Sequence, residues 1–340
     1  MFMPNSPGTL IVAGPNTVRI CPTMNHHAVE CTGRFMKRPK NIIFASRRTF
    51  LLNMLAVLGT LPAADWAAIA SQPTNFEGKD VFNRIVSRAD EGKWCTLPIG
   101  ELMGNIAQEL IGTKYVGGTL DLSRDREVCT VNLKALDCVT FFETTLAFAR
   151  MLKKEERTPD ALLTEVSFTR YRHGALGDYS TRLHYTTDWF EDNKNKHVVK
   201  LLSNLPGAEP FKQKVDFMSS HPNSYPQLVA HPELIPLIKQ QEDAINKRSL
   251  KFIPMHKISA IESHLKTGDI VGVCTNQPGL DIVHTGIVFR DTAGITHFMD
   301  ASSKKSSMQV TIEPGPISQA LNWSKNLTGI MLARPMEPKL

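Results

Sequence analysis

The sequence lacks the motifs of several common enzyme classes. Its six cysteines form no C-x-x-C pair and it has no H-E-x-x-H, so a zinc site of the usual spacing is not expected. The glycine-rich stretch at residues 112–120 does not end in the G-K-[ST] of a phosphate-binding loop. No internal repeat, low-complexity tract or heptad array occurs in the 340 residues. We therefore predict a globular protein that uses no metal and no other cofactor.

Excess positive charge is missing from most of the chain. The formal net charge is +6, but residues 1–70 contain seven basic and two acidic residues, which gives +5. The rest of the chain therefore carries about +1. A nucleic-acid partner has no electrostatic support from such a balance.

A run long enough to span a membrane is missing too. The apolar stretch between Arg48 and Pro62 has about fifteen residues, whereas a span needs roughly 20. Ser46-Arg47-Arg48-Thr49-Phe50-Leu51 matches S-R-R-x-F-L, so this stretch resembles a bacterial twin-arginine export signal. We expect cleavage before Ser71, with the twin-arginine translocase as a partner during export. The mature protein is then periplasmic, with no stable membrane span; a cytoplasmic amphipathic helix or an uncleaved anchor is the alternative.

Residues 1–35 precede this signal without any periodic pattern. Met36, followed by Lys37 and Arg38, makes a more natural start for an export signal. We therefore expect that the true start is Met36 and that residues 1–70 are an extension plus signal.

The strongest local pattern in the rest of the chain surrounds Cys138. Apolar residues recur at steps of three and four, at Val139, Phe142, Leu146, Ala149 and Leu152. This spacing predicts a buried helix with Cys138 in its first turn. Unpaired backbone N–H groups and the helix dipole favour a thiolate there, which is how a nucleophilic cysteine is made. The alternative is a small apolar residue at a helix start.

Other patterns predict an α+β fold in which helices come before a sheet. Helical spacing occurs at residues 81–88, 99–110 and 236–247. Short runs with strand composition occur at residues 270–275, 281–289, 295–302, 308–312 and 328–334. A helix followed by short antiparallel strands is typical of an α+β domain.

Basic and aromatic residues cluster between residues 164 and 185, where alternation predicts two strands joined through Gly174–Gly177. Rings and forked guanidinium donors suit sugars and carboxylates, which favours a binding surface. A solvated sheet face, or arginines held in internal ion pairs, is the alternative. The glycine-rich loop would pass close to the cysteine. The candidates for holding substrate are Tyr115, Arg170, Arg172, Arg182 and His184.

A histidine at a strand start could complete a catalytic arrangement with Cys138. His284 opens the run at residues 281–289, and a polar residue on the next run would orient its imidazole. That residue is Asp300 or His297, which face opposite sides of an unbroken strand because they differ by three positions. We favour Asp300, because a carboxylate accepts the ring N–H and stabilises the imidazolium.

The sequence resembles the NlpC-like, papain-related cell-wall hydrolases, and within them the N-acetylmuramoyl-L-alanine amidase-like branch. The shared motifs are Gly112-Thr113-x-Tyr115-Val116-x-Gly118-Thr119-Leu120, Leu136-Asp137-Cys138-x-Thr140-Phe141-x-Glu143, Arg170-Tyr171-Arg172-x-Gly174, Arg182-Leu183-His184-Tyr185, Gly268-Asp269-Ile270-Val271 and His284-x-Gly286-Ile287. They lie between about residues 100 and 335. The resemblance implies one catalytic domain over residues 71–340, with an insertion at about residues 155–255. Its papain-like core would pack the cysteine helix on an antiparallel sheet.

The resemblance also implies the site and the activity. Cys138 would be the nucleophile, His284 the base and Asp300 its partner, at a position where the superfamily often has a histidine. Asp137 would join the substrate-binding residues. The expected substrate is a muropeptide, cut between N-acetylmuramic acid, especially in its 1,6-anhydro form, and L-alanine.

Three alternatives stay open at this stage. The superfamily's commoner activity is cleavage of the L-alanine–γ-D-glutamate bond. A catalytically inactive muropeptide-binding module is a second possibility. In the third, cysteines pair into disulfides in an oxidising periplasm, with Cys95 and Cys129 as the candidate pair.

Overall fold

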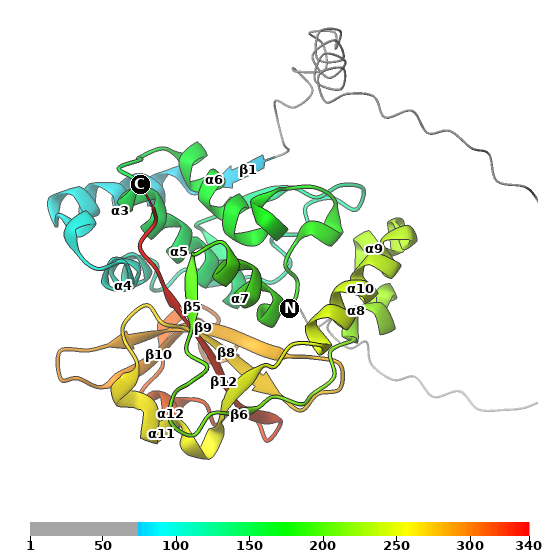
Figure 1. Ribbon diagram of the computed structural model, residues 1–340. Helices are drawn as coiled ribbons and strands as arrows, with labels where there is room; N and C mark the ends of the chain where they lie inside the picture. Colours follow the sequence, from blue (N-terminus) through cyan, green and yellow to red (C-terminus); the bar gives the residue numbers. More distant parts are fainter. Residues whose placement is uncertain (1–73, 340) are drawn as a thin grey trace, which may run out of the picture. The chain divides into compact units, whose positions relative to one another are not determined.

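The helices of the chain come before its main sheet. The structure is a computed structural model that describes residues 74–339. Figure 1 shows α3 to α7 on one side of the sheet and the short α11 and α12 on the other. The α-helices are α3 (Lys79–Glu91), α4 (Ile99–Glu109), α5 (Cys138–Lys153), α6 (Pro159–Arg170), α7 (Thr186–Asn195), α8 (Phe217–Ser220), α9 (Pro226–Ala230), α10 (Ile235–Asn246), α11 (Ile258–Ile261) and α12 (Ile317–Ala320).

Eight strands form the main sheet in the order β11-β10-β9-β8-β12-β7-β6, and β5 also pairs with β12. All of these pairings are antiparallel. Two small parallel pairs, β1 with β3 and β2 with β4, lie outside it. The strands are β1 (Thr74–Glu77), β2 (Lys114–Tyr115), β3 (Cys129–Asn132), β4 (Ala135–Leu136), β5 (Val199–Leu201), β6 (Glu209–Pro210), β7 (Lys251–Pro254), β8 (Ile270–Thr275), β9 (Ile282–Arg290), β10 (Thr296–Ala301), β11 (Val310–Ile312) and β12 (Leu327–Pro335).

Both faces of the sheet are buried, and side-chain alternation separates two cores. On β8, Ile270 and Cys274 belong to the core formed with α4, α5 and α6. Val271 and Val273 on the same strand belong to the core formed with α11 and α12. Because successive strand residues point to opposite faces, a strand buried on both sides reads as an unbroken apolar run. Helix α5 is therefore held between other helices and the sheet.

An extra residue interrupts β9 next to His284. Val273 pairs with His284 and Cys274 pairs with Ile282, so Val283 is a β-bulge. Ile282 and Ile287 both lie in the core facing the helices, although an unbroken strand would place them on opposite faces. The bulge thus lets His284 share a face with residues of β10 while Ile282 stays in the core.

The predicted α+β arrangement is confirmed, and so are most of its elements. The helix beginning at Cys138 and the run of strands from β8 to β12 are found within one or two residues of their expected bounds. The prediction of two strands within residues 164–185 is wrong. That segment contains the end of α6 and two 3₁₀ turns, Arg172–Gly174 and Tyr179–Thr181. Thr158 caps α6 and Pro159 is its first residue, which is a typical helix start. The sequence prediction gave more weight to the alternation of residues that follows.

The predicted insertion at about residues 155–255 contains helices α6 to α10. It also contains β5, β6 and β7, which join the main sheet. The export signal, the cleavage position before Ser71 and the start at Met36 lie outside the described residues. Among the helices of the described part, none is long and apolar enough to cross a membrane.

Candidate active site

Cys138 is the first residue of α5, and Asp137 caps the helix. One Asp137 carboxylate oxygen accepts the backbone N–H groups of Val139 and Thr140, at 2.9 and 2.8 Å. The Thr140 hydroxyl in turn accepts the N–H of Asp137, which completes a capping box. The cap therefore leaves the N–H of Cys138 as the first-turn donor beside the sulfur. Asp137 is buried in this cap, which is a structural position and differs from the substrate contact expected from sequence.

His284 lies between Cys138 and Asp300. Its Nε2 is 2.6 Å from Oδ2 of Asp300. The charges of His284 and Cys138 and a hydrogen bond between their side chains shift the pKa values of both residues, so the two side chains are neighbours. All three residues are buried, with Cys138 7% exposed. The thiol, imidazole and carboxylate thus form a continuous chain of contacts.

The charges of this chain favour a thiolate–imidazolium pair. Burial by itself raises the pKa of Cys138, but the charge and hydrogen bond of His284 outweigh it and the pKa is lowered. Burial likewise lowers the pKa of His284, but the Cys138 charge and the Asp300 hydrogen bond raise it to about 10. The proton therefore belongs on the imidazole and the negative charge on the sulfur.

The other buried cysteines have the opposite electrostatics. Burial raises the pKa of the Cys129 thiol to about 11, and it raises that of Cys274 well above the usual value. Cys95 and Cys129 are both free thiols in the structure. Among the buried cysteines of the described part, Cys138 alone has a lowered pKa.

His297 lies away from this arrangement. Its Nε2 is 3.1 Å from Oδ2 of Asp291 in the turn between β9 and β10. Because it differs from Asp300 by three positions on β10, its side chain leaves the opposite face of the strand. The geometry therefore places Asp300, and not His297, against the imidazole.

A cavity of about 260 Å³ opens beside His284 and Asp300. Trp323 lines it, is 40% exposed and has its ring centroid 5.9 Å from that of His284. Lys304 and Glu313 also line it, and they form an ion pair at 2.6 Å. The sequence analysis missed these three residues; an isolated tryptophan in the polar segment Asn322–Ser324 was the available signal.

Tyr115 lies close to the cysteine, as expected for a wall of the cleft. It belongs to β2, where it pairs with Leu136, the residue before Asp137. Its own N–H donates to Met308 O next to β11, so this loop joins both sides of the site. Burial first, and then the nearby Cys138 charge, raise the pKa of Tyr115 far above its usual value. Its hydroxyl therefore keeps its proton at all ordinary pH values.

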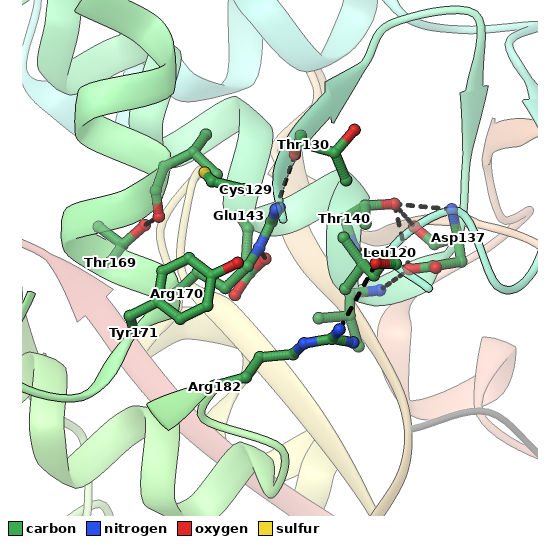
Figure 2. A network of polar contacts seen from close by, with 12 residues as sticks. Leu120, Cys129, Thr130, Asp137, Thr140, Glu143, Thr169, Arg170, Tyr171 and Arg182 are labelled. Atoms are coloured by element: carbon green, nitrogen blue, oxygen red, sulfur yellow. Dashed lines mark hydrogen bonds and ion pairs between the residues drawn. The ribbon is translucent and has the colours of Figure 1, made fainter. Parts of the chain in front are cut away.

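Arg170 is held in an internal ion pair (Figure 2). Its Nε is 2.7 Å from Oε2 of Glu143 on α5, and its Nη1 is 2.7 Å from the carbonyl oxygen of Thr130. The side chain is almost completely buried. Arg170 thus ties α6 to α5 and to β3, and one of its nitrogens, Nη2, has no partner among the described residues.

Arg182 is likewise engaged inside the protein. It forms a bidentate pair with Glu127, at 2.7 Å for both bonds, and a further contact with Asp121 at 3.0 Å. The hydroxyl of Tyr171 donates to the same Glu127 carboxylate. This buried network joins the loop before β3 to the segment after α6, and the sequence analysis did not identify Glu127.

Arg172 and His184 differ in their surroundings. Arg172 pairs with Asp188 at 2.6 Å, and Arg248 pairs with the other oxygen of the same carboxylate. This contact braces α7. Arg172 lines neither the cavity beside His284 nor the cavity along α5 that is described next. His184 donates from Nε2 to the carbonyl oxygen of Tyr179 at 2.7 Å. Arg172, like Asp137, is therefore a predicted substrate contact whose interactions are structural.

A second cavity, of about 130 Å³, is lined in part by Val139, the residue after the cysteine. It is lined by Arg170, Arg182 and His184, three of the residues that the sequence singled out. Trp189 and Tyr225 also line it. The site therefore has one cavity on the imidazole side and another along α5. Within the described residues, no group of three or more His, Cys, Asp or Glu is placed to hold a metal ion.

Helices followed by an antiparallel sheet are also found in solved amidase structures. A Bacteroides uniformis N-acetylmuramoyl-L-alanine amidase is 28% identical with a TM-score of 0.65, over 70% of this chain and 99% of that one. The AmiA-like family, described as N-acetylmuramoyl-L-alanine amidase-like, matches residues 105–322. The chain belongs to this family, which confirms the resemblance seen in its motifs.

Two further structures are similar. A Bacteroides fragilis protein, provisionally named a xylanase, is 30% identical with a TM-score of 0.60, over 67% of this chain and 98% of that one. A Legionella pneumophila protein of family DUF1460 is 18% identical with a TM-score of 0.55, over 76% of this chain and 95% of that one; it shares the fold alone. The curated proteins include no match.

Proposed function

We propose that the protein is a cysteine amidase that hydrolyses the bond between N-acetylmuramic acid and L-alanine in soluble peptidoglycan fragments, including those with 1,6-anhydro sugars. The observation that carries this proposal is the contact of one imidazole with both Cys138 and Asp300. Membership of the amidase-like family supports the choice of bond. In this view the fold is a papain-like core with an insertion.

The proposed reaction starts with attack of the Cys138 thiolate on the lactyl carbonyl carbon. A carbon–sulfur bond forms, and the carbonyl oxygen becomes an oxyanion. His284 then gives its proton to the L-alanine nitrogen as the carbon–nitrogen bond breaks. Next, His284 takes a proton from water, whose oxygen attacks the thioester and releases the sugar acid and the thiolate. Asp300 keeps the ring oriented and stabilises its charged form.

Two donors suit the oxyanion. The N–H of Cys138 is not used by the helix cap, whereas those of Val139 and Thr140 are bound to Asp137. The Tyr115 hydroxyl lies within range of the sulfur charge and stays protonated. Pre-positioned donors of this kind stabilise charge that develops in the transition state. The proposal therefore uses one backbone donor and one phenol.

The test is digestion of a purified N-acetylmuramoyl peptide followed by mass spectrometry of the products. A free peptide that begins with L-alanine is expected, and Cys138→Ala should abolish its formation while the thermal unfolding curve is unchanged. Cys95→Ala is the matched control and should retain activity, because Cys95 is not among the residues around the imidazole. A muramoyl-L-alanine product would instead assign cleavage of the L-alanine–γ-D-glutamate bond. Turnover by Cys138→Ala would remove the nucleophile assignment.

Two other functions fit the site less well. A glycoside hydrolase, the activity in the name of the B. fragilis protein, needs two carboxylates free to flank the bond. In the cavity beside His284, Asp300 bonds the imidazole and Glu313 pairs with Lys304. An inactive binding module has no use for a lowered thiol pKa. Amide hydrolysis uses both the bond between Asp300 and the imidazole and the lowered pKa of the thiol.

We also propose that the protein acts in the periplasm after twin-arginine export. The support is the S-R-R-T-F-L segment at residues 46–51 and the small residues before Ser71. A soluble muropeptide is then the partner, and the translocase contacts the chain only during export.

A further inference from the structure

We propose that the second cavity, along α5, is a subsite for the acetamido group of the sugar. This inference rests on the proposed function, since it assigns the sugar side of the same substrate. The cavity has a volume of about 130 Å³, and Val139, the residue after the nucleophile, is one of its lining residues. A water in the liquid occupies roughly 30 Å³, so this volume holds a group of only a few heavy atoms.

Three buried polar atoms belong to residues of this cavity and have no hydrogen-bond partner in the described part of the chain. They are Nη2 of Arg170, Nε1 of Trp189 and the hydroxyl of Tyr225. Arg170 and Trp189 are almost fully buried, so water in bulk does not satisfy their nitrogens. An unpaired buried donor destabilises the empty cavity, and a ligand oxygen that accepts these bonds would remove that cost. The cavity is therefore prepared for an acceptor.

The cavity also offers an acceptor of its own. His184 donates from Nε2 to Tyr179 O, which leaves Nδ1 with a free lone pair when the ring is neutral. Burial, followed by the charge of Arg182, lowers the pKa of His184 well below its usual value, so the ring stays neutral. A ligand that both accepts and donates a hydrogen bond, as a secondary amide does, matches this set of groups.

The charge of the cavity favours a neutral ligand over a carboxylate. Arg170 is compensated by Glu143, and Arg182 by Glu127 together with Asp121. The two guanidinium groups are thus already matched by carboxylates, and an added anion would gain little from them. The cavity should therefore bind a neutral amide better than the acidic groups of a stem peptide.

The remaining walls are apolar and suit a methyl group. They include Val139, Phe142, Leu183 and Met218. Burial of a methyl group against such walls removes apolar surface from water and favours binding. An acetamido group combines a methyl, a carbonyl and an N–H, and it lies on the sugar carbon beside the one that carries the lactyl ether. A carbonyl at Cys138 and an acetamido group beyond Val139 are therefore compatible in one ligand.

The test is binding, so that it does not depend on which bond is cut. Calorimetry would compare N-acetylmuramoyl-L-alanyl-D-isoglutamine with its de-N-acetylated form, using the full chain with Cys138→Ala at an alkaline pH where the free amine is uncharged. We expect binding of the de-N-acetylated ligand to be about tenfold to hundredfold weaker. Equal affinities, or binding of neither ligand, would overturn the subsite. The proposed function is judged separately, by cleavage with the unmodified enzyme.

A substitution in the cavity gives the second readout. Tyr225→Phe in the Cys138→Ala chain removes one unpaired hydroxyl and keeps the ring, so folding should be preserved. It should weaken the N-acetylated ligand several-fold and leave the de-N-acetylated one unchanged, which narrows the ratio of the two affinities. An equal effect on both ligands would assign the hydroxyl to general packing and contradict the proposal.

Discussion

At the residue scale, the reactivity of Cys138 depends on its neighbour more than on its burial. Burial of the sulfur opposes ionisation, and the protonated His284 reverses that effect. The thiolate forms as pH rises through the lowered pKa of Cys138. The imidazolium persists until pH rises through the His284 pKa of about 10. The ion pair is therefore present between those two values, and it is lost on either side of them.

The lowered pKa of Cys138 gives a prediction for alkylation of its sulfur. The rate at which iodoacetamide modifies Cys138 should reach half its maximum below pH 8.5, roughly the pKa of a free thiol. In His284→Ala the half-maximum should move to higher pH, because burial then acts alone. Stopped samples analysed by mass spectrometry measure the rate. A rate at pH 6 no faster than that of a small free thiol would contradict the ion pair.

The partner of the imidazole is tested by a pair of substitutions. Asp300→Asn should lower kcat by up to about 10⁴-fold, because an amide can hold the ring in the wrong tautomer. His297→Ala should leave kcat close to that of the unmodified enzyme, since His297 bonds Asp291 instead. Steady-state kinetics on a muramoyl peptide measure both. If His297→Ala proved the more damaging change, the assignment would be reversed.

Sequence reasoning identified Cys138, His284 and Asp300, which the structure brings together. These residues carry local signals: a helix start, a strand start and a two-residue periodicity. The arginines differ, because their partners are distant in sequence. Arg170 bonds Glu143 from another helix, and no local pattern encodes that contact.

At the element scale, the start of α5 depends on one carboxylate. Asp137→Ala removes the acceptor for two backbone N–H groups, and loss of such a cap costs about 1–2 kcal/mol of unfolding free energy. Asp137→Asn keeps an oxygen acceptor and should cost less. Urea unfolding followed by circular dichroism measures both. An equal loss in both variants would mean that the charge, and not the capping oxygen, matters.

The elements that sequence predicted correctly have a clear period, and the errors have physical causes. Helix α4 and strands β8 to β12 bury one or both faces, so their apolar spacing reflects their structure. Residues 164–170 are helical because Leu162, Leu163 and Val166 pack against α5, and the polar residues between them mimicked alternation. The bulge at Val283 could not be predicted, because it depends on pairing with β8.

At the scale of the whole molecule, the nucleophile and the base belong to different layers. Cys138 lies on a helix and His284 on the sheet. The loop at Thr113–Tyr115 is hydrogen-bonded both to β11 of the sheet and to β4, which directly precedes α5. Figure 1 shows these two layers and the segment α8 to α10 beside them. The site is therefore complete only when the layers are docked.

Export is a property of the whole chain and has its own test. Arg47→Lys together with Arg48→Lys should retain the protein in the cytoplasm, because twin-arginine recognition depends on the paired arginines. N-terminal sequencing of the exported form should begin at Ser71. The matched control, Arg38→Lys, lies outside the paired arginines and should be exported normally. Export of the doubly substituted chain would refute the twin-arginine assignment.

The single extra residue in β9 has a consequence for what that strand can do. If Val283 were kept and every residue of the strand paired regularly with β8, Ile282 and His284 would be two positions apart on one face. Either Ile282 would leave the interior or His284 would turn away from Asp300. The unpaired residue Val283 thus allows one strand to place Ile282 in the interior and His284 against the catalytic carboxylate.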